Sequence, residues 1–451
     1  MLSPYRDILS LPGARAFTAW GLLARVQMGL TGLGTFLLVQ LEYGRYEYAG
    51  MVVAAIAVSY AAISPQVGRL VDAYGQSRVL RWGFAVAIAG RLAMIAAVLA
   101  HQPIWVVLCL APLFAAGGTQ STHTRARWTH VVPDRHALNT AFSLESSLEE
   151  VLFIGGPAIA TILATQVASW VPAAVAVVSL AVGGYGFLAL TDTEPPARRR
   201  DARRRQGELQ HASALVIDGS MPRIGAAAST ASAHPPARRS YRGALRGHLL
   251  VTTPALVVTT VIFATQGALF ASVDASTVAF AEELGHQHWS GPVLAVFALG
   301  SLTGGLLYGS RAWTRTLASR LLWGVSATGL GAASFILAPN LAVLGALMFI
   351  TGLAIAPTMA VGDGVTHALV PRSRLTEGMT WTRTGMDLGI AAGAWLAGWI
   401  IDRHGSEGGF LVTAVAGLLG VAVAGAAWRY LRTRRAYEEQ VSRDEPLAVA
   451  G

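Results

Sequence analysis

Five ionisable residues lie within long apolar stretches of the sequence: Arg25, Glu145, Glu149, Asp274 and Asp387. A charged side chain in such a stretch is costly unless it meets an opposite charge or faces water. Where it does, a carboxylate can carry a proton and an arginine can bind an anionic group. Glu145 and Glu149 are four residues apart and therefore share one face of a helix. The five residues are candidates for contact with a substrate or for coupling to protons.

Each candidate also has a second interpretation. Arg25 could form a purely structural ion pair, and Asp387 could make a polar contact between packed helices. Asp274 could line a cavity or an outer gate, or could simply be exposed to solvent. Glu145 and Glu149 could pair near the membrane surface with one of three arginines, Arg125, Arg127 or Arg135. The sequence alone leaves these alternatives open.

Other residues of interest favour structural roles. Arg91 is equally deep in an apolar stretch and is interpreted as structural. Four tryptophans could stack on a substrate but are more typical of anchors at a membrane interface: Trp20, Trp381, Trp395 and Trp399. Three histidines are predicted at helix ends: His123, His130 and His367. We find no metal-ligand spacing, no nucleophile–base constellation and no Walker sequence, so we expect no metal, cofactor or catalytic residue.

The composition is that of a polytopic membrane protein. The chain has 451 residues, of which 53% are hydrophobic and only 13% are charged, and its mean hydropathy is +0.49. A soluble protein would carry about 25% charged residues. The chain contains no lysine, so the net charge of +9 reflects 34 arginines against 25 acids. The single cysteine, Cys109, excludes an internal disulfide and a Cys-based zinc or redox motif.

Hydropathy predicts an all-α integral membrane fold with twelve transmembrane helices. The first apolar run is too long for a signal peptide and has no cleavage pattern, so we expect an uncleaved first span. Every second connection is rich in arginine, which places both termini in the cytoplasm and the multi-pass chain in the plasma membrane. The predicted spans are 16–39, 49–71, 82–100, 103–122, 140–165, 169–190, 250–275, 290–309, 318–338, 341–362, 379–401 and 409–430.

The spans divide into two groups of six around a polar segment. We predict an N-terminal six-helix bundle at 1–190, a disordered Arg-rich cytoplasmic linker at 191–248, a C-terminal bundle at 249–435 and a cytoplasmic tail at 436–451. The linker is broken by prolines and carries clustered arginines. It could be a plain tether or could bind membrane lipids with anionic headgroups. No folded module accompanies its charge, so nucleic acid is not an expected partner.

The two groups of spans also resemble each other. An offset of 238 residues aligns Pro133 with Pro371 and Glu149 with Asp387. An acid at matched depth in both halves is what a duplicated six-helix unit would show. The sequence therefore predicts two pseudo-symmetric six-helix bundles.

The segment between the second and third spans resembles the loop motif of the major facilitator superfamily. That motif reads Gly-x-Leu-Ala-Asp-Arg-x-Gly-Arg-Arg, and the residues that match it directly are Gly68, Leu70, Asp72 and Gly75. Ala73, Gln76 and Ser77 replace three basic positions of the motif, and Arg78 comes one place later. Gly68 would permit close helix approach and Gly75 a tight turn. Asp72 would cap a neighbouring helix or pair with Arg78, a contact that in the family holds the outward-facing state.

A second, weaker motif lies in the fifth span. Gly155, Gly156 and Pro157 resemble the Gly-Pro-x-x-Gly-Gly motif of antiporters, and Pro157 can kink the helix. The resemblance to the superfamily, most of all to its drug and metabolite exporters, implies the major facilitator fold and a monomer without a cofactor. It implies a secondary active transporter that works by alternating access, exporting a small amphipathic molecule in exchange for protons. A proton-coupled importer of a sugar or organic acid is the alternative, and a membrane sensor or membrane-embedded enzyme is a remote one.

Overall fold

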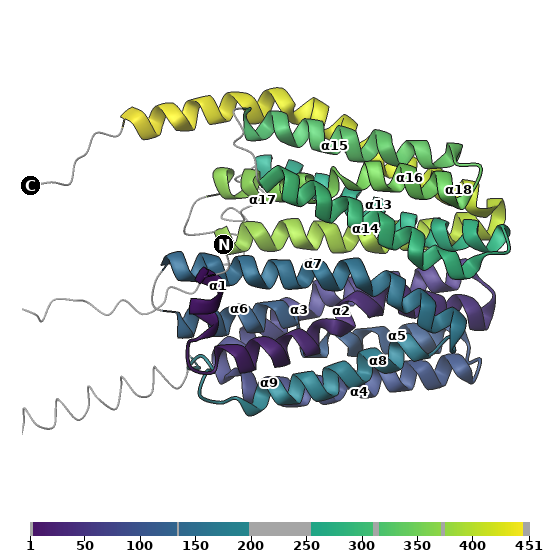
Figure 1. Cartoon of the computed structure of the whole chain (residues 1–451), viewed down its shortest axis with the longest axis horizontal. Coiled ribbons are helices and arrows are strands. Elements are labelled where there is room, and N and C mark those ends of the chain that lie inside the picture. The colour runs from purple at the N-terminus through teal and green to yellow at the C-terminus, as the bar shows by residue number, and fades with distance from the viewer. Residues whose placement is uncertain (1–2, 133–134, 198–253, 310–314, 371–374, 445–451) are drawn as a thin grey trace, which may run out of the picture.

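The computed structural model describes residues 3–132, 135–197, 254–309, 315–370 and 375–444. The regular elements in these residues are helices, and most run nearly parallel to one long axis (Figure 1). The helices α2 to α9 form one bundle and α13 to α18 form the other. Helix α1 and the C-terminal part of α18 lie at the same end of the molecule (Figure 1).

The N-terminal bundle contains the first eleven elements. They are α1 (Ser3–Leu9), α2 (Ala14–Tyr43), α3 (Tyr46–Tyr74), α4 (Gln76–Leu99), α5 (Ile104–Phe114), the 3₁₀ turn η1 (Ala115–Gly117), α6 (Gln120–Val131), α7 (Arg135–Gln166), α8 (Val171–Ser179), the π-helical turn η2 (Leu180–Gly184) and α9 (Tyr185–Ala189).

The C-terminal bundle contains the remaining elements. They are α13 (Pro254–Glu283), η3 (Gln287–Trp289), α14 (Ser290–Gly309), α15 (Leu317–Ala333), η4 (Ser334–Leu337), α16 (Leu341–Gly352), α17 (Ile355–Leu369) and α18 (Leu375–Asp444).

Eleven helical segments in the described part of the chain are long and apolar enough to cross a membrane. The last of them, Gly378–Trp428, has 51 residues, whereas about 20 residues suffice for one crossing. Gly405 interrupts it with a non-helical backbone (φ 66°, ψ −167°). The segment therefore holds two helices, and ten single crossings plus these two make the predicted twelve.

Several spans are longer than the hydropathy pattern predicts, and two of these extensions carry many polar side chains. The fourth, predicted to end at residue 122, continues as α6 to Val131, and the seventh, predicted at 250–275, continues in α13 to Glu283. Both extensions carry polar or charged side chains that make hydrogen bonds inside the protein, so low hydropathy does not end the helix there. Residues 250–253 of the predicted seventh span lie outside the described residues.

The two ends of the molecule differ in how the bundles meet. We call the end that carries Glu47, Glu282 and Asp402 the acidic end, and the opposite end, which carries Arg78, the Arg-rich end. One apolar core joins both bundles at the acidic end, where Leu37 of α2 and Val273 of α13 belong to the same buried cluster. At the Arg-rich end each bundle has its own separate core. The bundles are therefore joined at one end and apart at the other.

Close backbone contacts seal the acidic end. A Cβ added to Gly50 of α3 would lie 2.1 Å from the carbonyl oxygen of Ala394 in α18, and one added to Gly398 would lie 2.3 Å from that of Tyr46. The two backbones can approach this closely only because glycine has no side chain. Residues 191–197, the described start of the predicted linker, pack on the N-terminal bundle, where Ala197 is 5% exposed. Residues 198–248 of the predicted linker lie outside the described residues.

Candidate functional site

A buried charge cluster joins α2 to α7 in the N-terminal bundle. Arg25 of α2 lies 2.5 Å (Nη2 to Oε2) from Glu145 and 3.0 Å (Nη1 to Oε1) from Glu149, both on α7. The side chains of Arg25 and Glu145 are fully buried, whereas that of Glu149 is 15% exposed. Arg25 also donates from Nε to the carbonyl oxygen of Gly21, at 3.0 Å. The structure therefore brings together three of the five predicted candidates.

Helix α6 completes this cluster. Trp128 donates from Nε1 to Glu145 at 2.7 Å, and Arg125 lies 3.1 Å from the second carboxylate oxygen of Glu149. The cluster thus contains two arginines and two glutamates, so its formal charge is zero when both acids are ionised. Charge balance of this kind lowers the cost of burying each member. The structural interpretation is supported by the ion pairs of Arg25 with both acids. The coupling interpretation stays open, because the side chain of Glu149 is 15% exposed.

The sequence explains why α2 and α7 come close enough for this pairing. Glu145 and Glu149 are one helical turn apart and face the same neighbour. About two turns further along, a Cβ on Gly156 would lie 2.4 Å from the carbonyl oxygen of Gly29. Pro157 lies inside α7, where it removes one backbone hydrogen bond of the helix. Gly156 is therefore the position that lets α7 pack against α2.

The C-terminal bundle holds the other two candidates apart from the cluster. Asp274 lies on α13 and Asp387 on α18, and each is partly exposed. No hydrogen bond or ion pair is recorded for either carboxylate within the described residues. The nearby Arg383 instead pairs with Asp363, at 3.3 Å. Within the described residues, Asp274 and Asp387 thus form no ion pair of the kind that Glu145 and Glu149 form with Arg25.

Glycines bring α13 and α18 together around these acids. Cβ atoms on Gly385, Gly389 and Gly393 would lie 2.5, 1.9 and 2.3 Å from successive carbonyl oxygens of α13. This glycine series therefore lets the backbones of α13 and α18 pack tightly. The pair α13–α18 in the C-terminal bundle therefore corresponds to the pair α2–α7 in the N-terminal bundle.

The remaining buried arginines have neutral partners. Arg91 donates to Gln27 (2.5 Å), to the hydroxyl of Tyr60 (3.0 Å) and to the carbonyl oxygen of Ala87 (3.1 Å). These contacts support its structural interpretation. Arg127, considered above as a partner for the glutamates, bonds elsewhere, to the residues Gln76, Leu190 and Thr193. The side chain of Arg135 lies outside the described residues.

The predicted gating motif is only partly as expected. Gly75 has a left-handed φ of 98° and forms the turn between α3 and α4, as predicted. Gly68 meets no described atom within 4 Å of an added Cβ, so the expected close approach is absent in this conformation. Asp72 and Arg78 are both exposed, and no ion pair between them is recorded in the described residues. The separate cores of the two bundles at this end are consistent with the open space beside Gly68.

The corresponding contact occurs at the acidic end instead. Both carboxylate oxygens of Asp402 in α18 accept backbone N–H groups at the start of α3, from Tyr46 at 2.8 Å and Glu47 at 2.9 Å. An acid at a helix N-terminus satisfies free N–H groups and interacts favourably with the helix dipole. Arg45 lies 3.6 Å from Asp402, and Arg403 lies 3.8 Å from Glu47. We call these four charged residues, Arg45, Glu47, Asp402 and Arg403, the acidic-end clamp.

A second polar contact adds to the clamp. Glu282 of α13 accepts hydrogen bonds from the hydroxyl of Tyr46 and, at 2.9 Å, from the amide of Gln40 in α2. From the sequence, Glu282 and Asp402 stand out only because the connections near them contain few arginines. Their hydrogen-bond partners lie far away in the chain. The matching helix-end acids Asp72 and Asp402 are the signal by which the clamp could have been found.

Comparison with known protein families gives one decisive result. The family model described as "Major Facilitator Superfamily" matches residues 20–341 and 293–450, which together cover most of the chain. The chain belongs to the major facilitator superfamily. A comparison of its sequence with curated proteins finds no match.

Solved structures of other transporters share the fold of this superfamily member. The crystal structure of the nucleoside transporter NupG is 15% identical, covers 92% of this chain and 98% of that chain, and has a TM-score of 0.61. The peptide transporter POT in complex with sulfate is 14% identical, covers 96% and 98%, and has a TM-score of 0.62. A bacterial homologue of the iron transporter ferroportin in the inward-facing state is 14% identical, covers 91% and 98%, and has a TM-score of 0.59. At sequence identities this low, the similarity shows a shared fold and nothing about substrate.

The superfamily assignment settles the general class of the protein. It is a multi-pass membrane transporter and not an enzyme. No group of three or more potential metal ligands occurs among the described residues. Three of the four tryptophans considered as stacking partners are exposed, as is typical of lipid-facing anchors: Trp20 (37%), Trp395 (48%) and Trp399 (36%).

Proposed function

We propose that this superfamily member is a secondary active antiporter that exports a small amphipathic molecule or drug across the plasma membrane in exchange for protons. In this proposal it works by alternating access as a monomer, without a cofactor. The observation that supports it is that the bundles are joined at the acidic end and apart at the Arg-rich end. Under the positive-inside rule the Arg-rich end, with both termini, faces the cytoplasm. The protein would then be open to the compartment from which it takes its cargo.

The charge cluster supplies the proposed site of proton coupling. Glu149 contacts two arginines, Arg25 and Arg125, and is the more exposed of the two acids of the cluster. A proton arriving at Glu149 would remove its attraction for both arginines and leave Arg25 paired with Glu145 alone. Asp274 and Asp387 would take protons or contact the substrate from the opposite bundle. Protonation would thereby change the balance between the two orientations of the bundles.

Transport driven by an imposed pH gradient tests this proposal. Purified protein in liposomes would be screened with amphipathic cations, sugars and organic acids, first with no gradient and then with one. We expect gradient-dependent movement of an amphipathic compound, and loss of the gradient dependence in Glu149→Gln. Asp274→Asn and Asp387→Asn test the acids of the C-terminal bundle in the same way. Glu407→Gln is the matched control, because Glu407 is an exposed acid of α18 outside these contacts.

The outcomes distinguish the alternatives. Accumulation in inverted vesicles supports export, whereas accumulation in whole cells supports import of a sugar or organic acid. An acid whose neutral amide variant transports like the unmodified protein has no coupling role. No response to any compound or gradient would overturn coupled transport and favour the remote alternative of a membrane sensor.

A further inference from the structure

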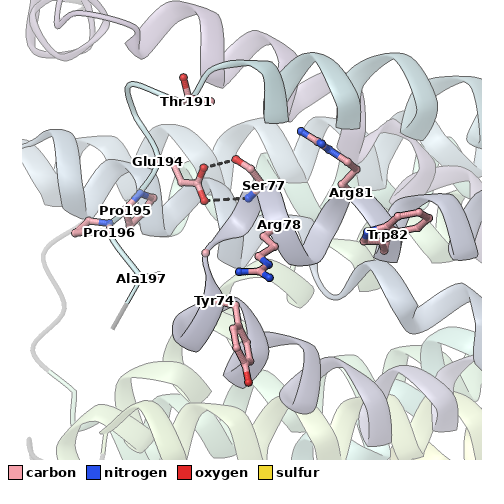
Figure 2. A pocket seen from close by; sticks show the side chains of 11 residues that line it. Tyr74, Ser77, Arg78, Arg81, Trp82, Thr191, Glu194, Pro195, Pro196 and Ala197 are labelled. Atoms are coloured by element: carbon pink, nitrogen blue, oxygen red, sulfur yellow. Dashed lines mark hydrogen bonds between the residues drawn. The ribbon is translucent and has the colours of Figure 1, made fainter. Parts of the chain in front are cut away.

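A cavity of about 550 Å³ lies at the Arg-rich end of the N-terminal bundle, away from the charge cluster. Its wall consists of the turn from α3 to α4, the first turns of α4, and the segment that follows α9 (Figure 2). Cavities of this size hold small organic groups. Nothing in the proposed transport mechanism uses it.

The wall of this cavity is positively charged. It includes Arg78 and Arg81 of α4 and a single acid, Glu194. Both arginines are exposed, and no ion pair is recorded for either in the described part of the chain. The carboxylate of Glu194 is already occupied, because it accepts the backbone N–H of Ser77 at 2.9 Å and the hydroxyl of the same residue (Figure 2). The cavity therefore has two free guanidinium groups to offer an anion.

The position of the cavity suggests which anion reaches it. Helix α4 is a membrane span that begins at Gln76, so Arg78 and Arg81 lie at the level of lipid headgroups. Trp82 follows them in the cavity wall and is 74% exposed. Tryptophan prefers the region where headgroups meet acyl chains. Two arginines and an exposed tryptophan within five residues thus match a molecule with a phosphate at one end and hydrocarbon at the other.

We propose that this cavity binds the phosphate-bearing headgroup of an anionic phospholipid, such as phosphatidylglycerol. Arg78 and Arg81 donate to the phosphate oxygens, for which the planar guanidinium group is well suited. Trp82 lies beside the glycerol and the upper acyl chain. The proposal holds for either direction of transport, since it concerns a structural lipid and not the cargo.

Lipid binding to the full-length protein in detergent tests the proposal. Native mass spectrometry would measure the affinity for phosphatidylglycerol and for phosphatidylcholine. Each basic residue near an anionic membrane surface contributes enough to change affinity about fivefold. We therefore expect Arg81→Gln to weaken phosphatidylglycerol binding about fivefold and Arg78→Gln/Arg81→Gln about 25-fold. Phosphatidylcholine binding should not change.

Two further variants make the result specific. Arg69→Gln is the matched control, because Arg69 is an exposed arginine at the same end of the bundle but outside the cavity. Trp82→Phe keeps an aromatic ring and should bind nearly as well as the unmodified protein, whereas Trp82→Ala should bind less. Since these side chains are exposed, folding should be retained, and thermal unfolding in phosphatidylcholine micelles checks it.

The measurements can overturn the proposal in three ways. Equal weakening by Arg69→Gln and Arg81→Gln would show attraction to the whole surface and not a site. Unchanged phosphatidylglycerol binding in the double variant would remove the arginines from any lipid contact. Inorganic phosphate that protects the protein as well as the lipid does, with the same dependence on Arg78 and Arg81, would identify a soluble phosphate site instead.

Discussion

The two ends of helix α3 have contrasting surroundings. At the acidic end, Gly50 packs against the backbone of α18 and Asp402 caps the first turn of α3. At the Arg-rich end, Gly68 has open space around it among the described residues, and Asp72 is exposed. Each end carries a glycine and a helix-end acid, so the chemistry is similar and only the distance between the bundles differs. Helix α3 thus takes part in the contact between the bundles at one end, where Asp402 of α18 caps it, and carries the predicted gating motif at the other.

The contrast between the two ends of α3 requires that the N-terminal bundle moves as a rigid unit. The largest expected effect is therefore on the stability of that bundle. Arg25→Gln leaves the buried Glu145 without its ion-pair partner, which should destabilise the protein by about 3–5 kcal/mol. Unfolding in detergent followed by tryptophan fluorescence measures the loss. The triple variant Arg25→Gln/Glu145→Gln/Glu149→Gln should recover part of it. A loss below about 1 kcal/mol would mean that the cluster does not hold the bundle together.

The next effect concerns the glycines at the two ends of α3. Gly50→Ala forces a methyl group into the backbone of α18 and should disfavour the closed acidic end by about 1–3 kcal/mol. Gly68→Ala, the matched control, should leave the same equilibrium unchanged. Spin labels at Val167→Cys and Glu407→Cys in a Cys109→Ser background would report the distance between the bundles there. Equal distances in both glycine variants would remove the contrast between the ends.

A smaller effect is expected for the helix-end acids. Asp402→Ala removes the cap on α3 and should weaken the closed acidic end by about 1 kcal/mol. Asp72→Ala should have no effect on this conformation, because no contact of its carboxylate is recorded in the described residues. The same pair of spin labels measures both variants. A shift caused by Asp72→Ala in the direction expected for Asp402→Ala would contradict the assignment of one acid to each gate.

The smallest effect is expected for the exposed part of the clamp. The side chain of Arg45 is 46% exposed and lies 3.1 Å from Glu47. Exposed ion pairs contribute little and are screened by salt, so Arg45→Gln should change the equilibrium by less than about 1 kcal/mol. The difference should vanish when the distance measurement is repeated at high salt. A larger, salt-independent effect would place Arg45 among the principal contacts of the closed end.

The sequence predicts the helices well because a membrane span is a local property. Apolar length alone locates the twelve crossings, and Glu145 and Glu149 reveal their shared face by their spacing. The partners of these residues are different. Arg25 is 124 residues from Glu149, and no local pattern indicates that Trp128 donates to Glu145. These contacts depend on how helices pack, which the order of residues along one helix does not determine.

The sequence also does not predict the conformation, in which the bundles are joined at the acidic end and apart at the Arg-rich end. Gly68 and Asp72 match a motif, and the motif indicates a contact that exists in one orientation of the bundles only. The same sequence is compatible with every arrangement of the two bundles, so it does not indicate which end is closed in this structure. Asp402 was missed as a gate for the same reason, since its partners belong to a helix 356 residues away in the chain.

The glycine contacts also constrain how the gene can change. Almost every single-base change in the first two positions of a glycine codon introduces a side chain at least as large as a methyl group. At Gly389, where an added Cβ would lie 1.9 Å from a carbonyl oxygen of Ala264, every such change meets a backbone that cannot move aside. At Gly68 the same changes meet open space. Mutational tolerance at the glycines of this chain should therefore follow helix contacts, with intolerant codons on α2, α7, α13, α14, α18 and the half of α3 nearest the acidic end.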